Sequence, residues 1–512
     1  MITKLTRISE PVKASQENWP ASRILIYTRG ILRVVAVMPG SPVSDRGSKA
    51  TGMVSDRRTA ERTILVTVVL GAMLAPLNST MITVALPTLL GDFGRSLVWG
   101  SWIVASYLVA MAAFQPLGGS LGDRYGRQRL FLIGLMLFLV ATVVAALSWS
   151  IEVLIAARTV QAVAGATAIP NGTALVRSLI VPERQGRAFG IVASAIALAA
   201  GLGPPLGGAL TAALGWRWIF AANILLIAPA LILGLRLPAV SSATSTGRFD
   251  LRGAALLICG LVSLVLALTV WRLPGVPLVL APVLGLLAVG MSLALVLHTG
   301  RSPKPVLNLA LFRARGFTPA VTTVLLSNLT MYTLLLSLPV FLVGWGNWGD
   351  AHVGLLLAGL SLPMVFFSPL GGRLSDRSGR RLPAFSGTVL IALGTLPFLA
   401  IAPFWSWPLY LAPLFLLGIG SGLSIASLQA TAIETVSLGQ AGQAAGLFST
   451  MRYLGSILGS SVMAAVLNGS TPPVDNFRLL YAALFLSACG AIITAWGLPT
   501  WIRGAGGGET EP

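Results

Sequence analysis

The side chains of this chain that could do chemistry are a few charged and amide groups inside or beside long apolar segments. Arg158 and Gln161 fall within one such segment and would lie one turn apart on a helix. Because a cation inside a membrane span is costly, Arg158 is a functional-site candidate. Carboxylates, which can take up and release a proton, lie only near segment ends, and Glu152 and Glu434 are the candidate proton carriers. The sequence has no P-loop lysine, His-Glu-x-x-His motif or Cys/His cluster, so we expect no hydrolytic enzyme, no metal site and no cofactor.

One charged stretch occurs twice. The first copy runs Gly119-Ser-Leu-Gly-Asp123-Arg124-Tyr-Gly126-Arg127, and the second places Gly372, Asp376, Arg377, Gly379 and Arg380 in the same pattern. The aspartates lie 376 − 123 = 253 residues apart, about half the chain, which predicts two related halves. In so apolar a chain, repeated halves are typical of a transporter. If the turn is helical, Asp123 can pair with Arg127 at i,i+4.

Composition indicates where these residues lie. Hydrophobic residues make up 55% of the chain and charged residues only 10%, whereas a soluble domain carries roughly 25% charged residues. Most of the chain is therefore expected to lie in a lipid bilayer. The net charge of +19 could indicate nucleic-acid binding, but the basic residues lie between apolar segments. Basic loops facing an anionic inner leaflet explain them better, and no nucleic-acid partner is expected.

Fourteen apolar segments have about the 20 residues that a helix needs to cross a bilayer. They run roughly 64–89, 98–120, 130–149, 152–175, 188–211, 216–237, 253–272, 276–298, 317–345, 351–371, 384–403, 407–430, 441–467 and 478–501. We therefore expect an all-α integral membrane protein with fourteen transmembrane helices. Residues 64–237 and 317–501 would form two pseudo-symmetric six-helix halves, and 253–298 an inserted helix pair. Residues 1–60, expected to be disordered, and 502–512 would be tails.

Loop charges predict the orientation. If the turn after 98–120 is cytoplasmic, the loops on that side carry most of the loop arginines. The positive-inside rule then puts both termini in the cytoplasm. Tryptophans such as Trp149, Trp216 and Trp405 fall at the opposite ends, where an aromatic belt is expected. The expected location is the plasma (inner) membrane of a bacterium, with many passes.

Two further motifs lie inside predicted helices. The segment 188–211 contains Gly203, Pro204, Gly207 and Gly208, which predict a kinked seam where two backbones approach closely. A plain packing kink is the alternative. The first predicted helix carries Asn78 and Thr83 in the stretch from Leu77 to Pro87.

Taken in order, these motifs resemble those of the major facilitator superfamily, and in particular its fourteen-helix drug:proton antiporter branch. The resemblance covers nearly all of 64–501. It implies that the two copies of the turn brace an inner gate through Gly119, Asp123, Arg124, Gly126, Arg127, Asp376, Arg377 and Arg380. It implies an exporter motif at Gly203, Pro204, Gly207 and Gly208. The helices that would face a central cavity supply Asn78, Thr83, Arg158, Gln161, Asn328, Tyr332 and Gln429.

The function expected is secondary active export of a small organic compound by alternating access, with proton antiport. The partners would be the substrate, protons and the bilayer, and the protein would be a monomer. The alternatives are a metabolite transporter or facilitator without proton coupling, or a non-transporting receptor or scaffold. The polar cavity residues argue against a scaffold, and the exporter motif argues against an importer.

Charge inside the bilayer predicts substrate preference. Asn78 stands where the family usually has an aspartate, and asparagine cannot carry a proton at neutral pH. With no central carboxylate to balance Arg158, the cavity should disfavour cations and favour neutral, zwitterionic or anionic compounds. One alternative stays open, in which Glu434 neutralises Arg158 or pairs with Arg452. If protons are coupled, Glu152, Glu434 or the substrate itself carries them.

Overall fold

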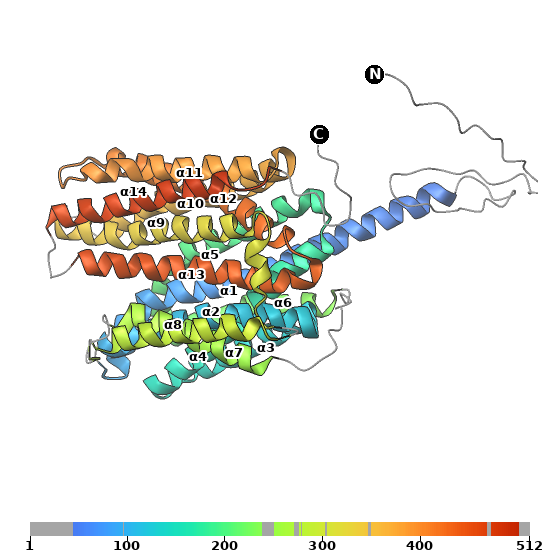
Figure 1. Cartoon of the computed structure of the whole chain (residues 1–512). Helices are drawn as coiled ribbons and strands as arrows, with labels where there is room; N and C mark the ends of the chain where they lie inside the picture. The colour runs from blue at the N-terminus through green and yellow to red at the C-terminus, as the bar shows by residue number, and fades with distance from the viewer. Residues whose placement is uncertain are drawn as a thin grey trace, which may run out of the picture. The chain divides into compact units, whose positions relative to one another are not determined.

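The structure, a computed structural model, describes residues 45–95, 97–237, 250–270, 276, 277, 279–302, 305–346, 350–467 and 473–500. Within these ranges every regular element is a helix (Figure 1). The α-helices are α1 (Asp45–Asp92), α2 (Leu97–Tyr125), α3 (Arg127–Ala146), α4 (Ile151–Leu179), α5 (Pro182–Leu214), α6 (Arg217–Leu235), α7 (Leu251–Thr269), α8 (Leu280–Thr299), α9 (Phe317–Gly344), α10 (Asp350–Ser378), α11 (Arg381–Thr395), α12 (Trp407–Glu434), α13 (Ala441–Val466) and α14 (Val474–Trp496). Short 3-10 helices are η2 (Leu309–Arg313), η3 (Leu396–Ala400) and η4 (Leu438–Gln440).

The chain divides into two units, Met1–Thr59 and Ala60–Pro512. In the first unit only the start of α1 is described. This helix begins at Asp45, within the predicted tail 1–60. No proline occurs between Asp45 and Ala75, so no proline stops the helix from extending past the start of the apolar segment toward the N-terminus. Residues 1–44 and the predicted tail 502–512 lie outside the described residues.

The helices agree with the predicted spans, with one exception. Among the described residues, 13 helices are long and apolar enough to cross a membrane. The exception is α13, a helix of 26 residues whose glycines, serines and Arg452 make it more polar than the others. It packs against both α2 and α9, so these residues can lie between helices and away from lipid. The described residues thus form an all-helical membrane protein, and the number of fourteen spans stays a prediction.

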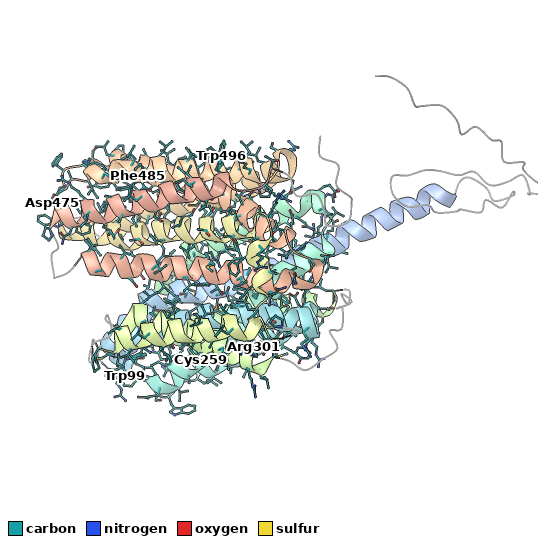
Figure 2. The ribbon with its side chains drawn as sticks, in the orientation of Figure 1. Trp99, Cys259, Arg301, Asp475, Phe485 and Trp496 are labelled. Atoms are coloured by element: carbon teal, nitrogen blue, oxygen red, sulfur yellow. The ribbon has the colours of Figure 1, made fainter. Side chains whose placement is uncertain are left out.

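Apolar side chains cover the outer surface of several helices. In α8, Leu286 and Val289 are 74% and 68% exposed, and Ala288 and Leu295 are the buried residues. Soluble proteins rarely expose continuous apolar faces, whereas lipid contact requires them. Figure 2 shows Trp99 and Asp475 at one end of the helices and Arg301 toward the other, in agreement with their predicted opposite loops.

The packing of the first six helices recurs eight helices later. α4 packs against α2 and α3, and α3 packs against α6. In the same way α12 packs against α10 and α11, and α11 packs against α14. The two groups meet along two seams, one between α2 and α13 and one between α5 and α10. These are called the α2–α13 seam and the α5–α10 seam below.

The inserted pair lies on one of these seams. α7 and α8 pack against each other, and α7 also packs against α2 and α13. Among the described residues, neither helix packs extensively on α5 or α10. Asp250 holds the pair together, since its carboxylate accepts the N–H of Gly253 at 2.9 Å and lies 2.7 Å from Nε2 of His298. Burial alone raises the pKa of Asp250, but these bonds and the N–H of Val306 outweigh burial and hold that pKa below its usual range.

Candidate functional site

The two repeated turns share one local structure. Gly126 alone separates α2 from α3, and its φ is 105°. Gly379 has a φ of 84° at the same place in the second copy. A positive φ favours glycine, which explains why this position recurs. The turn is shorter than predicted, because Gly119 and Gly372 lie inside α2 and α10.

The predicted ion pair forms across each turn. Nη2 of Arg127 lies 2.9 Å from Oδ1 of Asp123, and Nη1 of Arg380 lies 3.0 Å from Oδ1 of Asp376. The side chains of all four residues are at most 10% exposed. Buried charges need both a partner and further hydrogen bonds, and here the aspartates obtain them from other helices.

Asp123 reaches across the α2–α13 seam. Its two oxygens accept the backbone N–H groups of Gly442 and Gln443, each at 2.9 Å. Both N–H groups belong to the first turn of α13, where the helix dipole favours an anion. Arg127 adds a hydrogen bond to the carbonyl of Leu438, just before α13. We call this set of bonds the first latch.

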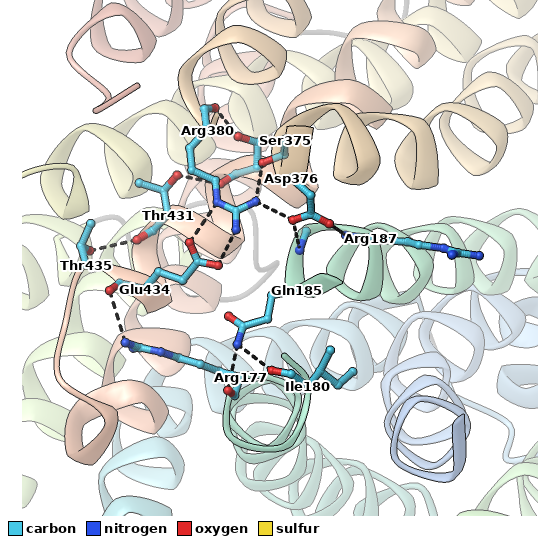
Figure 3. A network of polar contacts seen from close by, with 12 residues as sticks. Arg177, Ile180, Gln185, Arg187, Ser375, Asp376, Arg380, Thr431, Glu434 and Thr435 are labelled. Atoms are coloured by element: carbon cyan, nitrogen blue, oxygen red, sulfur yellow. Dashed lines mark hydrogen bonds and ion pairs between the residues drawn. The ribbon is translucent and has the colours of Figure 1, made fainter. Parts of the chain in front are cut away.

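Asp376 reaches across the α5–α10 seam in the same way. It accepts the N–H groups of Gly186 and Arg187, each at 2.8 Å, near the start of α5 (Figure 3). Arg380, which holds Asp376, also forms a two-pronged ion pair with Glu434, with distances of 2.9 Å and 2.6 Å. We call this set the second latch.

Paired glycines allow the helices of each latch to touch. A Cβ at Gly119 would overlap the carbonyl oxygen of Gly442, and one at Gly442 would lie 2.5 Å from the carbonyl oxygen of Gly119. Likewise, a Cβ at Gly372 would overlap the carbonyl oxygen of Gly186, and one at Gly186 would lie 2.6 Å from that of Gly372. Any other residue would separate the backbones. The glycines therefore set the distance at which the aspartates can reach the opposite helix.

Glu434 belongs to the second latch and not to the Arg158 site. Its carboxylate pairs with Arg380, and its backbone carbonyl accepts Nη2 of Arg177 at 3.2 Å (Figure 3). Arg177 also donates to the carbonyl of Val436 at 2.6 Å. The alternative in which Glu434 neutralises Arg158 or Arg452 is wrong, because the carboxylate of Glu434 already pairs with the buried guanidinium of Arg380.

Arg158, Gln161 and Asn78 contact one another in the structure. Oε1 of Gln161 accepts Nδ2 of Asn78 at 3.1 Å and Nη1 of Arg158 at 3.3 Å, while its Nε2 donates to Thr142 at 2.9 Å. The guanidinium carbon of Arg158 lies 4.3 Å from the ring centre of Tyr107. Arg158 is only 1% exposed, and no carboxylate among the described residues pairs with it. Only an aromatic face and an amide oxygen balance this cation.

Several buried polar atoms around Arg158 lack a hydrogen-bond partner within the described part of the chain. They are Oδ1 of Asn78, Nε of Arg158 and the hydroxyl of Tyr107. An unpaired buried polar group is costly, so this cluster is suited to a ligand that supplies hydrogen bonds. We call these residues the Arg158 group.

Two of the other predicted cavity residues, Asn328 and Gln429, make their hydrogen bonds away from the Arg158 group. Asn328 donates to the carbonyl of Arg452 at 2.8 Å, thereby joining α9 to α13. Gln429 lies 3.5 Å from Thr173, near the far end of α4 from Arg158. Tyr332 lies half-buried in α9. The side chain of Thr83 lies outside the described residues.

The remaining charged candidates lie near the surface. Glu152 pairs with Arg95 at 3.0 Å, with both side chains about half exposed. The guanidinium of Arg124 lies 5.5 Å from the ring centre of Tyr125. Arg377 is exposed and lines a cavity beside the second latch. Of the two proton-carrier candidates, only Glu434 is therefore buried in a network.

Some residues of the glycine motif of α5 pack closely on α1, and others do not. α5 runs unbroken through its prolines, and Pro204 is exposed. Gly203 and Gly207 are buried, and a Cβ at Gly207 would lie 2.7 Å from the carbonyl oxygen of Met81. At Gly208 the nearest atom would be 3.6 Å away, an ordinary contact distance. The close approach expected at all three glycines is therefore corrected for Gly208.

The sequence was compared with known families. The model of the Major Facilitator Superfamily matches residues 68–460, a range that includes both latches, the α5 glycines and the Arg158 group. The chain belongs to the major facilitator superfamily. The superfamily consists of transporters, so this protein is a multi-pass membrane transporter.

Individual members support this assignment. The uncharacterised superfamily transporter YvkA of Bacillus subtilis is 35% identical over 83% of this chain and 95% of its own length. The multidrug resistance protein Stp of Mycobacterium tuberculosis is 34% identical over 79% of this chain and 76% of its own length. The crystal structure of the human organic anion transporter MFSD10 (TETRAN) matches with a TM-score of 0.61 and 20% identity, covering 84% of this chain and 99% of that chain, which shows the fold.

The helix N-termini held by the latches were missed in the sequence. A signal for them exists, because Gly186 and Gly442 lie 442 − 186 = 256 residues apart, close to the 253-residue separation of the two aspartates. Gly186 follows the end of α4 by a few residues, and Gly442 follows the end of α12 in the same way. A second repeat at nearly the same separation would have pointed to these positions.

Gly207 and Gly208 provide a matched pair of variants in this superfamily member. We expect Gly207→Val to reduce transport at least about tenfold, since its side chain would push α5 away from the Met81 backbone. Gly208→Val should keep most of the activity, because the site has space for a Cβ. Transport rates in vesicles with equal amounts of inserted protein measure both. Similar losses in the two variants would contradict the role given to the Gly207 contact.

Proposed function

We propose that this superfamily member is a secondary active exporter that moves a small organic compound by alternating access in exchange for protons. In this proposal the end that carries both latches faces the cytoplasm, as its basic residues favour. The protein lies in the plasma membrane as a monomer, with both termini inside. The similarity to a relative named a multidrug resistance protein supports the export of organic compounds.

The proposal also includes the symmetry. Residues 64–237 and 317–501 form two pseudo-symmetric halves, with α13 as one of fourteen spans. The recurrent packing and the two glycine pairs support this arrangement.

The observation that carries the proposal is the reciprocity of the latches. Asp123 of the first half holds α13 of the second, and Asp376 of the second half holds α5 of the first. Bonds that tie two halves together at one end must break when that end opens and re-form when it closes. Alternating access requires such contacts. A receptor or scaffold would not need them.

Glu434 is the proton carrier that the geometry favours. Its carboxylate holds Arg380, which in turn holds Asp376. Protonation of Glu434 would remove half of this network and loosen the second latch. Glu152 forms an exposed ion pair at the other end of α4, about 40 Å along the helix from Arg177. A proton taken up there would not act on either latch.

The Arg158 group favours neutral, zwitterionic or anionic substrates. Its buried cation has no acid partner among the described residues, where Nε of Arg158 and the hydroxyl of neighbouring Tyr107 also lack a hydrogen-bond partner. A substrate carboxylate or carbonyl would supply the missing acceptor, whereas a permanent cation would add repulsion.

A transporter without proton coupling is the second candidate. The observation that favours it is the absence of a carboxylate from the described Arg158 group, where Asn78 occupies the position of the family's usual aspartate. In this case the substrate carries its own proton or moves down its gradient.

Everted vesicles test both candidates. We expect vesicles with the wild-type protein to accumulate organic acids or neutral compounds, and an imposed pH gradient to increase this uptake severalfold. In Glu434→Gln the gradient should have no effect, because an amide cannot take up a proton. Glu152→Gln is the matched control and should respond like the wild type. Wild-type uptake that does not change with the pH gradient would favour the transporter without proton coupling. A lack of uptake of every compound would contradict transport.

A further inference from the structure

The α5–α10 seam contains a cavity of about 850 Å³ beside the second latch. Arginines line its polar side, two from α5 and two from α10: Arg184, Arg187, Arg373 and Arg377. Apolar side chains of α10 and α12, among them Phe367 and Leu370, line the rest. The cavity is therefore both basic and apolar.

The positive charge of this cavity is mostly unbalanced. Within the described ranges, no carboxylate pairs with Arg187, Arg373 or Arg377, and Arg184 pairs with a glutamate of α1 at 3.0 Å. Of the two acids in the lining, Asp376 is occupied by the α5 N–H groups, and Glu183 is exposed. Grouped arginines without partners repel one another unless an anion joins them.

The first latch lacks three of these four arginines, whereas Arg377 has a basic counterpart in Arg124. The separation of the two aspartates, 253 residues, makes Ser120 the counterpart of Arg373. The separation of Gly186 and Gly442, 256 residues, makes Gln443 the counterpart of Arg187 and Gln440 that of Arg184. The first latch has the same aspartate bonds and the same glycine contact with these neutral residues. Arg184, Arg187 and Arg373 are therefore basic residues that occur at the α5–α10 seam and not at the equivalent positions of the α2–α13 seam.

An apolar stripe leads away from the arginines along α10. Leu362, Phe366 and Leu370 lie four positions apart on one face and are 54%, 68% and 46% exposed. Arg373 and Arg377 continue the same face at the end of the helix. The ligand that fits is amphipathic, with an anionic head and an apolar tail.

We propose that this cavity binds the phosphate headgroup of an anionic phospholipid from the leaflet next to the latches, with an acyl chain lying along the α10 stripe. Basic pockets between helices at the membrane surface suit such headgroups. The inserted pair lies on the α2–α13 seam and leaves the α5–α10 seam to the lipid. A lipid held by arginines of both α5 and α10 would strengthen the second latch.

Native mass spectrometry of the full-length protein in detergent tests this site. We expect phosphatidylglycerol to bind more tightly than phosphatidylcholine with the same acyl chains. Arg187→Gln/Arg373→Gln should weaken phosphatidylglycerol binding about tenfold or more, since each basic residue contributes about fivefold at a membrane surface. Both side chains are exposed, so folding should persist. Arg313→Gln/Arg315→Gln is the matched control, with the same loss of exposed charge elsewhere.

Each other outcome would overturn the proposal. Equal affinity for the two lipids, or equal loss in the control variant, would show a general charge effect. Displacement of the lipid by glycerol phosphate would show a site for free anions. If the wild type binds no phosphatidylglycerol but Glu509→Gln/Glu511→Gln does, the acidic end of the chain occupies the cavity instead. None of these measurements requires transport, so their result is independent of the proposed function.

Discussion

Asp123→Asn is expected to lower transport at least tenfold while the protein still inserts and folds. The carboxylate accepts two N–H groups of α13 at 2.9 Å and pairs with Arg127, and the amide would lose the charge and one acceptor. A loss of about 3 kcal/mol from charge-assisted bonds would shift the balance between closed and open latch ends about a hundredfold. Uptake into everted vesicles, at matched protein level, measures the effect.

Two further variants test whether the effect of Asp123→Asn is specific to the first latch. Asp376→Asn should impair transport less, because Arg380 stays bound to Glu434 and keeps part of the second latch. Asp475→Asn is the control for the loss of a carboxylate, since that side chain is 85% exposed and pairs only with Arg478 among the described residues. Normal transport by Asp123→Asn would refute the role of the latch in the cycle.

The second large effect concerns charge selection. We expect the wild-type protein to export permanently cationic dyes such as ethidium poorly and Asn78→Asp to export them at least tenfold better. The new carboxylate would lie beside Gln161, which already contacts Arg158. After the side-chain amide of Gln161 flips to present its NH₂ group to the carboxylate, the carboxylate would neutralise the buried cation. Dye efflux from whole cells measures both proteins.

Asn78→Ser is the matched neutral variant and should leave cations excluded. If Asn78→Asp and Asn78→Ser export ethidium equally, position 78 does not select by charge. Robust ethidium export by the wild type would contradict the argument that buried Arg158 excludes cations. Export of an organic anion should fall in Asn78→Asp, because Arg158 would then be occupied.

Much of this architecture could be read from the sequence, because hydropathy and loop charge act locally. The helices, the repeat and the Asp123–Arg127 pair follow from spacing along one segment. The N–H partners of the aspartates could not be predicted, since Gly442 and Gly186 lie on helices that only the folded bundle brings close. The same reason explains the error about Glu434, whose position near a span end gave no hint of Arg380. The prediction of α13 as a membrane span stays open, because its buried serines and glycines make it too polar to be recognised as a span from composition alone.

The cavity residues show the same limit. Asn78, Arg158 and Gln161 lie in contact in the structure; two of them share a helical turn and the family resemblance supplied the third, while their place in a transport cavity stays a prediction. Asn328 and Gln429 were grouped with them by helix number alone, and their contacts lie elsewhere. Gly208 is adjacent to Gly207 in sequence but lies 100° around the helix, which is why only Gly207 lies against the backbone of α1.

The paired glycines restrict the ways in which the latch end can loosen. At Gly119 and Gly442 the backbones already touch, and about 0.7 Å of further separation would take the 2.9 Å aspartate bonds out of hydrogen-bonding range. A parting of this size would forfeit both contacts and gain none, so partly open forms have no stabilising interactions of their own. The cycle should then pass between two discrete states and not through a continuum. A compound that places a single methyl group between these glycines would act as an inhibitor without ever entering the substrate pathway.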